Sequence, residues 1–559
     1  MSALMTRPVH FQERNIMRQI CYLPLIALFA FGAALAADAP DSQHKQQIDE
    51  EQAIEMVAAA LAAAPGLEFD TGFSVTGMRS IEPPVNTGWS DVEDGIRVFP
   101  WMGSATIGNP PIPIPVHLGY YVAVRQKNAA NTLEKVMVTR LKVDGALDLD
   151  FGTNGWLQAE NASSSIADVA MGRYGELYIL HAGEKRVGCH RLEAGTTCHS
   201  PTSGGKLSYP LTAPRTAATP TRLLYDSRYG LYVAAKITNA DRGTELAVTL
   251  MQPAGATGSS GGTPVTTFGT NGHVIGLPSW AAATGVTAAI NAMALTPASA
   301  TGGQRLYVGG EVMRANPDSD GFILGLNPTT GATISGWDWR DVYYESDNTG
   351  SKADAVTALA VLRNGSGYGG KLVYAGWSAT DSADAKPMIM GRLGNDGIWD
   401  TSFCAGNANH TTRACLVDPP RLLLTIPVYM PAAIPVAIVE RSNRDLAVAQ
   451  RFQQNGLPLF GEPDRHVHTL VQQFGQDGNR LYTQLKVDYP ASDPDTTTWW
   501  SRPFDMVASG AFGDRLALIG TRKWNGTDFD PTVTALKGAT EDHVCLFSDG
   551  MESARPACW

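Results

Sequence analysis

The chain contains the stretch Leu149-Asp150-Phe151-Gly152-Thr153-Asn154-Gly155-Trp156, and this stretch occurs more than once. It returns as Thr267-Phe268-Gly269-Thr270-Asn271-Gly272-His273-Val274, and in altered form as Trp399-Asp400-Thr401-Ser402-Phe403-Cys404-Ala405-Gly406. A glycine-rich turn that recurs among β-rich segments is typical of repeat proteins. The recurrence of this turn therefore predicts a repeat architecture for the chain.

The segments around this turn are repeated as well. Upstream of the first and third copies, an alternating strand ends in Arg-Leu-x-x-Asp-Gly, at residues 140–145 and 392–397. Hairpins with a Leu-Tyr or similar second strand recur at intervals of 54 to 75 residues, so each unit has room for about four short strands. Alternation bounded by Gly, Asn and Asp turns indicates antiparallel strands.

Such units have to close on one another, because a single unit would leave sheet edges and an apolar face exposed. The pattern predicts an all-β chain with a single β-propeller of about seven four-stranded blades, six or eight remaining open. An alternating strand at Phe73–Met78 lies near the start, whereas the last unit has three clear strands, the third at Thr532–Leu536. We therefore expect an N-terminal strand to complete the last blade.

The combination of Arg-Leu-x-x-Asp-Gly with Leu-Asp-x-x-Phe-Gly-x-x-Gly resembles the delta-60 repeat of exported bacterial propeller proteins. The resemblance covers most of residues 110–540 and is closest in the units that end near residues 156, 274 and 406. Two positions depart from it, because Thr267 replaces the usual Asp and Cys404 replaces the usual Gly. The family implies a propeller fold and no shared catalytic residues.

The N-terminus has the pattern of a signal peptide over residues 1–36. Arg14 and Arg18 precede the apolar run 22–31, and Ala34-Leu35-Ala36 offers a cleavage site. The run is shorter than the roughly 20 residues that span a bilayer, so we expect no membrane span after cleavage and a periplasmic or secreted protein. A short N-terminal helix is expected within 37–66, the propeller in 67–540 and a tail in 541–559.

Cysteine usage and charge agree with export. Six cysteines follow the signal peptide as three close neighbours, which predicts three local disulfides in an oxidising compartment. The expected pairs are Cys189–Cys198, Cys404–Cys415 and Cys545–Cys558. Removal of residues 1–36 takes away three arginines and one glutamate, so the formal net charge changes from −11 to −13. An acidic chain without a basic cluster argues against nucleic acid as a partner.

Several motifs could bind a metal, but each has a simpler interpretation. Cys189-His190 and Cys198-His199 could hold zinc, although a disulfide is favoured because neighbouring strand residues face opposite ways. His466-x-His468 lacks a third ligand. Asn316-x-Asp318-x-Asp320-Gly321 begins like a calcium loop but has Asn327 where a bidentate Glu belongs. We therefore predict no metal and no cofactor.

Two aromatic clusters are candidate ligand sites. Trp499-Trp500 could form a stacking platform for a sugar or peptide, and Trp337, Trp339, Tyr343 and Tyr344 form a second cluster. Tryptophan packs between propeller blades equally well, so a core role is the alternative for each.

No catalytic residue can be assigned, because no nucleophile elbow, phosphate-binding loop or His, Cys or carboxylate constellation has the spacing that chemistry requires. The sequence therefore predicts a non-enzymatic propeller that binds an unknown protein or glycan, or a structural module of the cell envelope. The alternative is a hydrolase or lyase that acts on polysaccharide with carboxylates in the central channel. An enzyme should gather charged side chains around the axis, whereas a binding module should present aromatic or flat polar patches.

Overall fold

The computed structural model describes residues 67–538 with interruptions. The gaps are 75, 85–88, 108–111, 160–164, 194, 199–204, 254–261, 298–302, 315–317, 345–352, 364–367, 380–385, 406–410, 418–431, 442, 455–465, 482–484, 488–500, 510–514 and 524–528. The predicted signal peptide, N-terminal helix, C-terminal tail, the Cys545–Cys558 pair and Trp499-Trp500 therefore lie outside the described residues. Among the described residues, no helix could span a membrane.

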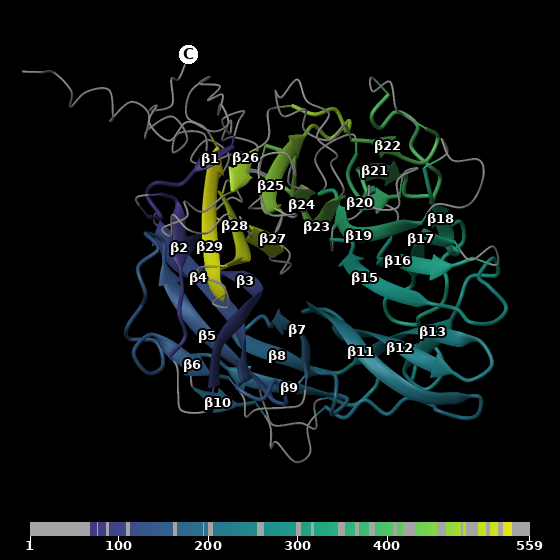
Figure 1. The fold of residues 1–559 in the computed structure, drawn as a ribbon, viewed down its shortest axis with the longest axis horizontal. Helices are drawn as coiled ribbons and strands as arrows, with labels where there is room; N and C mark the ends of the chain where they lie inside the picture. Colours follow the sequence, from purple (N-terminus) through teal and green to yellow (C-terminus); the bar gives the residue numbers. More distant parts are fainter. Residues whose placement is uncertain are drawn as a thin grey trace, which may run out of the picture. The chain divides into compact units, whose positions relative to one another are not determined.

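The described residues form seven four-stranded antiparallel blades, which confirms the predicted all-β propeller (Figure 1). Blade 1 is β3 (Trp89–Ile107), β4 (Ile112–Asn128), β5 (Glu134–Lys142) and β6 (Trp156–Gln158); blade 2 is β7 (Ile166–Met171), β8 (Glu176–His181), β9 (Arg186–Arg191) and β10 (Thr196–Thr197). Blade 3 is β11 (Arg215–Asp226), β12 (Gly230–Asn239), β13 (Gly243–Met251) and β14 (His273–Gly276); blade 4 is β15 (Ala288–Leu295), β16 (Leu306–Met313), β17 (Ser319–Leu326) and β18 (Arg340–Val342). Blade 5 is β19 (Asp354–Val361), β20 (Leu372–Ser378), β21 (Met388–Leu393) and β22 (Cys415–Leu416); blade 6 is β23 (Ala432–Glu440), β24 (Leu446–Gln454), β25 (His466–Phe474) and β26 (Leu485–Val487). Blade 7 is β27 (Ser501–Ser509), β28 (Arg515–Lys523) and β29 (Phe529–Gly538), completed by β1 (Leu67–Phe69) and β2 (Met78–Ser80).

The first strands of the blades form the inner ring of the propeller. Each first strand contacts the first strand of the next blade, and β27 contacts β3, so the ring is closed. Figure 1 shows these strands facing the middle of the ring. Four of them contain a proline, at Pro100, Pro220, Pro435 and Pro503. Proline fits an edge strand, because it has no N–H for a further partner.

The apolar core is divided among the blade boundaries. Seven clusters of buried apolar side chains occur in the described residues, and each joins the facing sides of two neighbouring blades. The boundary between blades 4 and 5 holds Tyr307, Trp337 and Tyr374, all fully buried. Trp337 therefore has the core role that was the alternative to ligand binding.

The propeller is closed by the N-terminal segment, as predicted. Both β1 and β2 pair antiparallel with β29. The expected strand Phe73–Met78 is wrong in detail, because β1 ends before it, β2 begins only at Met78, and Phe73 lies in a turn. This turn satisfies backbone groups that a straight strand would leave unpaired, since the Phe73 N–H donates to Asp70 O at 2.8 Å.

The closing segment carries a further copy of the repeat. Its residues Phe69-Asp70-Thr71-Gly72-Phe73 match residues 399–403 in the spacing of Asp and Phe. The Asp70 N–H donates to Ala535 O at 2.9 Å, as Asp148 and Asp400 donate to Arg140 O and Arg392 O at 2.9 Å. The N-terminal segment is thus the outer strand of the last blade in hydrogen bonding as well as in position.

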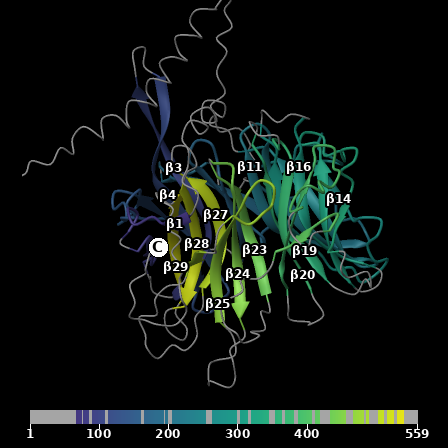
Figure 2. The same cartoon turned by 90° about the horizontal axis from the view of Figure 1, so that it is seen from above.

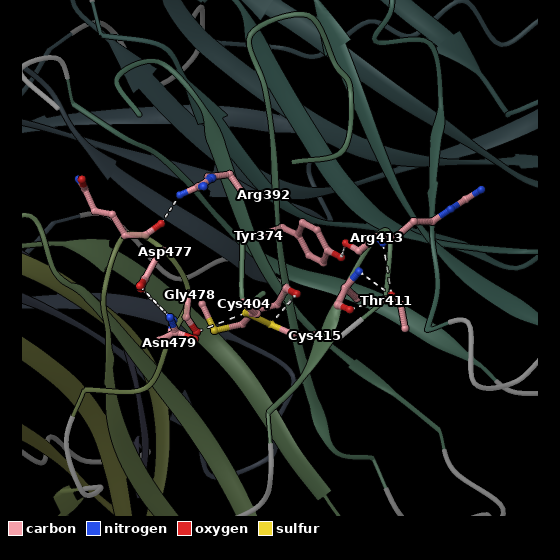
Figure 3. The surroundings of a disulfide bond; sticks show 12 residues. Tyr374, Arg392, Cys404, Thr411, Arg413, Cys415, Asp477, Gly478 and Asn479 are labelled. Atoms are coloured by element: carbon pink, nitrogen blue, oxygen red, sulfur yellow. Dashed lines mark hydrogen bonds between the residues drawn. A yellow bond between two sulfur atoms is a disulfide. The ribbon is translucent and has the colours of Figure 1, made fainter. Parts of the chain in front are cut away.

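The turn after each repeat phenylalanine requires a left-handed backbone. Gly152, Gly269 and Cys404 occupy equivalent positions with φ of 58°, 56° and 60°. Glycine adopts this conformation at little cost, whereas Cys404 is held there by its disulfide to Cys415 and by an N–H bond to Asp477 O (Figure 3). The Cys404 departure from the repeat therefore reflects a cross-link.

Two of the predicted disulfides are confirmed. Cys189 bonds to Cys198 in blade 2, and Cys404 bonds to Cys415 in blade 5. The first bond rules out the zinc alternative for these thiols, because both sulfurs are consumed.

Blade 1 extends beyond its neighbours as a two-stranded arm (Figure 2). Residues 112–118 of β4 pair with β3 alone among the described strands, because the pairing of β4 with β5 begins at Gly119. The Pro-rich residues 112–115 of this arm lie at the edge of the sheet, where proline is tolerated because it has no N–H to donate.

Candidate functional site

Every first strand contains a β-bulge at the same level of the propeller. In each case one residue is skipped in the pairing with the second strand of its blade. A bulge turns its side chain away from the regular alternation. The skipped residues are all half-buried: Ile96, Ala167, Thr221, Asn291, Thr357, Val436 and Phe504.

The type of residue that follows the bulge differs between two groups of neighbouring blades. Blades 4, 5 and 6 have alanine there, at positions 292, 358 and 437. Blades 7, 1, 2 and 3 have Asp505, Arg97, Asp168 and Arg222, in alternating charge around the ring. We call these four charged residues the axial belt.

Arg97 joins three blades. Its Nε and Nη2 donate to the two oxygens of Asp168 in blade 2, each at 3.0 Å. Its Nη1 donates to Asp505 Oδ1 in blade 7 at 3.1 Å. Burial by itself would lower the pKa of the Arg97 guanidinium, but the charges of Asp168 and Asp505 outweigh it and raise that pKa. Arg97 is therefore a fixed cation in the closed ring.

Asp168 is saturated with hydrogen bonds. Besides the two from Arg97, it accepts the Val169 N–H at 2.9 Å and the Leu223 N–H of blade 3 at 3.0 Å. A carboxylate offers about four acceptor positions, so none is left for a ligand. Burial opposes ionisation, but Arg97 and these donors overcome it and lower the pKa of Asp168.

Asp505 is held less tightly. Its second oxygen is 3.5 Å from the Val98 N, which is at the limit of a hydrogen bond. Burial raises the pKa of Asp505, and the charge of Asp168 adds to this effect, while Arg97 opposes it. The pKa values of the two carboxyl groups of the axial belt are therefore shifted in opposite directions.

Arg222 is the member of the axial belt whose terminal guanidinium nitrogens make no hydrogen bond or ion pair with the described residues. Its Nε donates to Asn291 O in blade 4 at 3.0 Å. Among the described residues, no hydrogen bond or ion pair involves its two terminal nitrogens. Burial lowers the pKa of Arg222, and the charge of Asp168 opposes this. The structure thus leaves a half-buried guanidinium with an open pair of donors in the inner ring.

The other sequence candidates do not join the axial belt. Trp499-Trp500 lie outside the described residues, directly before β27, and their ligand role stays a prediction. His466 and His468 lie in β25. Asp320 lies in β17 rather than in a loop, where it pairs with Arg314, and burial raises its pKa to about 6. No group of three or more His, Cys, Asp or Glu in the described part is arranged to hold a metal ion.

The axial belt was missed by sequence reasoning. Its members lie far apart in the chain, and the bulges shift their alignment within each strand. The available signal was a charged residue inside an otherwise apolar strand, as in Ile166-Ala167-Asp168-Val169-Ala170-Met171. Such a residue is costly to bury unless it is paired, so its presence in a first strand indicates a partner across the ring.

No family model matches the chain, and no curated protein matches it, so membership of the delta-60 family stays a prediction. Several solved structures are similar in fold. A catalytically inactive virginiamycin B lyase from Staphylococcus aureus with quinupristin shares 10% identity at a TM-score of 0.34, over 82% of this chain and 98% of its own. A protein from Lactobacillus plantarum shares 12% identity at 0.36, over 80% and 99%. An exo-1,5-alpha-L-arabinanase from a bovine ruminal metagenomic library shares 11% at 0.31, over 60% and 99%.

Proposed function

We propose that the protein is an exported, non-catalytic β-propeller that binds a carboxylate-bearing ligand at the axial belt, through Arg222. The observation that carries this proposal is the open pair of terminal nitrogens on Arg222. A planar guanidinium with two parallel donors matches the two oxygens of a carboxylate. Its partial burial strengthens such a bond relative to one on the open surface.

The remaining members of the axial belt support binding rather than catalysis. Arg97 pairs with both Asp168 and Asp505 across three blades, so these contacts hold the inner ring closed. Asp168 has no free acceptor to serve as a base. A ligand carboxylate at Arg222 would then meet a preorganised donor.

Export is part of the proposal. Two disulfides in the propeller are typical of proteins that fold in an oxidising compartment. The predicted signal peptide points the same way. The ligand would therefore be an acidic glycan or an acidic peptide outside the cytoplasm.

A hydrolase or lyase is the second candidate, and one observation favours it. The pKa of Asp505 is raised and that of Asp168 is lowered, which is the division of roles found in acid–base pairs. In that case Asp505 would act as the acid, and Asp505→Asn would abolish turnover of an acidic polysaccharide.

The experiment is a titration of the purified mature protein with galacturonate oligomers, a glutamate-rich peptide and their uncharged counterparts. We expect saturable binding of a carboxylate-bearing ligand without turnover. Arg222→Gln should weaken it by about tenfold or more, since a hydrogen bond to a charged group contributes about 1.5–3 kcal/mol. Arg173→Gln, a change of the same charge in a turn of blade 2, should leave it unchanged. Turnover that Asp505→Asn abolishes would replace this proposal by the second candidate.

A further inference from the structure

Four side chains from blade 4, blade 5 and the segment between blades 3 and 4 form an alternating series of rings and guanidinium groups. The Arg314 guanidinium lies 4.8 Å from the ring centre of Trp280 and 5.9 Å from that of Tyr343. The Arg413 guanidinium lies 4.2 Å from the ring centre of Tyr343. We call Trp280, Arg314, Tyr343 and Arg413 the aromatic–arginine ladder.

Two carboxylates fix the arginines of the ladder. Asp341 Oδ1 is 2.6 Å from Arg413 Nη1, and Asp341 Oδ2 is 3.2 Å from Arg314 Nη2. Arg314 also pairs with Asp320 through its Nε. Each arginine of the ladder therefore has an aspartate as its counter-charge, and its planar group is held in place before any ligand arrives.

The ladder is built on blade 4, blade 5 and the segment that connects blades 3 and 4. Arg314 directly follows β16, Tyr343 directly follows β18, and Arg413 precedes β22 of blade 5. Trp280 lies between β14 and β15, and its indole N–H donates to Trp339 O at 3.3 Å. The Trp339 ring packs on Phe322, with ring centres 5.2 Å apart.

One backbone feature sets this region apart from an ordinary surface. Trp339 has a φ of 35°, a conformation that bulky residues rarely adopt. Such outliers concentrate at functional sites, where the surrounding contacts hold them. Trp280, Arg314, Asp341, Tyr343 and Arg413 are all half-buried, so part of each side chain is exposed to solvent.

We propose that the aromatic–arginine ladder is a binding platform for an uncharged saccharide. Aromatic rings present an apolar face that suits the C–H face of a sugar, and the flanking arginine and aspartate edges can exchange hydrogen bonds with its hydroxyl groups. Both guanidinium groups are already paired with carboxylates, which favours a neutral sugar over an anion. Four side chains are a small area for a protein partner, whose interface buries about 800 Å² per side.

This platform goes beyond the proposed axial ligand and does not depend on it. The two lie on different elements, since the ladder contains no residue of a first strand. An Arg222→Gln variant should therefore keep full affinity for the ladder ligand. Loss of acidic-ligand binding and loss of neutral-sugar binding are separate outcomes.

The test uses the full mature protein and the neutral hexasaccharides of β-1,4-linked glucose, xylose, mannose and galactose, followed by tryptophan fluorescence and calorimetry. We expect at least one of them to bind. Trp280→Ala and Tyr343→Leu should each weaken that binding about tenfold or more, because each removes one stacked ring. Tyr343→Phe keeps the ring and should stay within about twofold.

Tyr174→Ala is the matched control, because Tyr174 is an exposed tyrosine that also stacks with an arginine, Arg173 at 5.8 Å. It should leave binding unchanged. If a ladder variant fails to fold, shielding of Trp280 from acrylamide by the sugar in the wild-type protein, read against Trp280→Phe, decides the question. The proposal is overturned if none of the four sugars binds, if galacturonate hexamer alone binds, or if the ladder variants bind as the Tyr174 variant does.

Discussion

Arg97 and Asp168 are joined by two parallel hydrogen bonds of 3.0 Å across the boundary between blades 1 and 2. The Asp168 side chain is 2% exposed, so water solvates its charge very little. Removal of one partner from a buried pair commonly costs about 3–5 kcal/mol, because the other charge is left uncompensated. Loss of Asp168 alone is therefore expected to destabilise the closed ring strongly.

The first prediction compares the two carboxylates of the axial belt. Asp168→Asn should lower the free energy of unfolding by about 3 kcal/mol at pH 7, and Asp505→Asn by about 1 kcal/mol or less. Asp505 makes one good hydrogen bond to Arg97 and one at the 3.5 Å limit. Urea denaturation of the three proteins measures the difference. Equal losses would contradict the ranking.

The pH dependence of the same variants should have opposite signs. The pKa of Asp168 is lowered by folding, so its contribution is present above its unfolded pKa of about 3.9 and is lost as the pH falls below it. The pKa of Asp505 is raised by burial, so its contribution is lost as the pH rises through the folded value. The gap between wild type and Asp168→Asn should shrink below about pH 4. The free energy of unfolding of Asp505→Asn should increase relative to that of wild type as the pH rises above about 4.

The second prediction concerns closure by the N-terminal segment. Phe73→Ala should cost about 3–5 kcal/mol, because the ring is fully buried between blades 7 and 1. Gly145→Ala should also destabilise the protein strongly, since a Cβ there would lie 2.0 Å from Phe73 O. Thermal and urea unfolding provide the measurement.

Gly175→Ala is the control for closure. Gly175 has a φ of 78°, close to the 77° of Gly145, but a Cβ at Gly175 would meet nothing within 4 Å. Both variants bear the left-handed backbone cost of about 1 kcal/mol, and only Gly145→Ala has the added clash. Equal effects of the two would mean that the Phe73 contact does not hold the ring closed.

The propeller could be predicted from the sequence because its repeated turns depend on local chemistry. Gly152 and Gly269 occupy left-handed positions that few other residues accept, and Asp-Gly turns end the third strands. The N-terminal closure could be predicted because the last unit lacks one strand. The residues of the closing strand could not, because the Phe69–Phe73 copy of the repeat lacks the glycine after phenylalanine.

The axial belt could not be predicted in the same way. Arg97 and Asp505 are more than 400 positions apart, and a bulge precedes each of them. Only the pairing of each first strand with its neighbour shows that the four charged residues occupy one level. The aromatic–arginine ladder could not be predicted for the same reason. Tyr343 belongs to an aromatic cluster in the sequence, but its arginine partners Arg314 and Arg413 come from other parts of the chain.

The third prediction concerns the disulfides. Loops of about 10–15 residues closed by a disulfide gain roughly 3 kcal/mol in the chain-entropy model, so Cys189→Ser with Cys198→Ser should lower stability by up to about this amount while the blades stay folded. Unfolding monitored by circular dichroism measures it. Loss of the whole fold on this change would be inconsistent with a local role. Peptide mapping without reduction should also find Cys545 joined to Cys558, and a free thiol at either would refute that pairing.

The most direct test of the central claim is the affinity of wild type, Arg222→Lys and Arg222→Gln for the carboxylate ligand identified in the titration panel. Lysine keeps the charge but loses the pair of parallel donors, and glutamine loses both. We predict affinities in the order Arg, Lys, Gln, with about tenfold or more between the first and the last. Equal affinities of the three proteins, or equal binding of the uncharged counterpart, would contradict carboxylate recognition by Arg222.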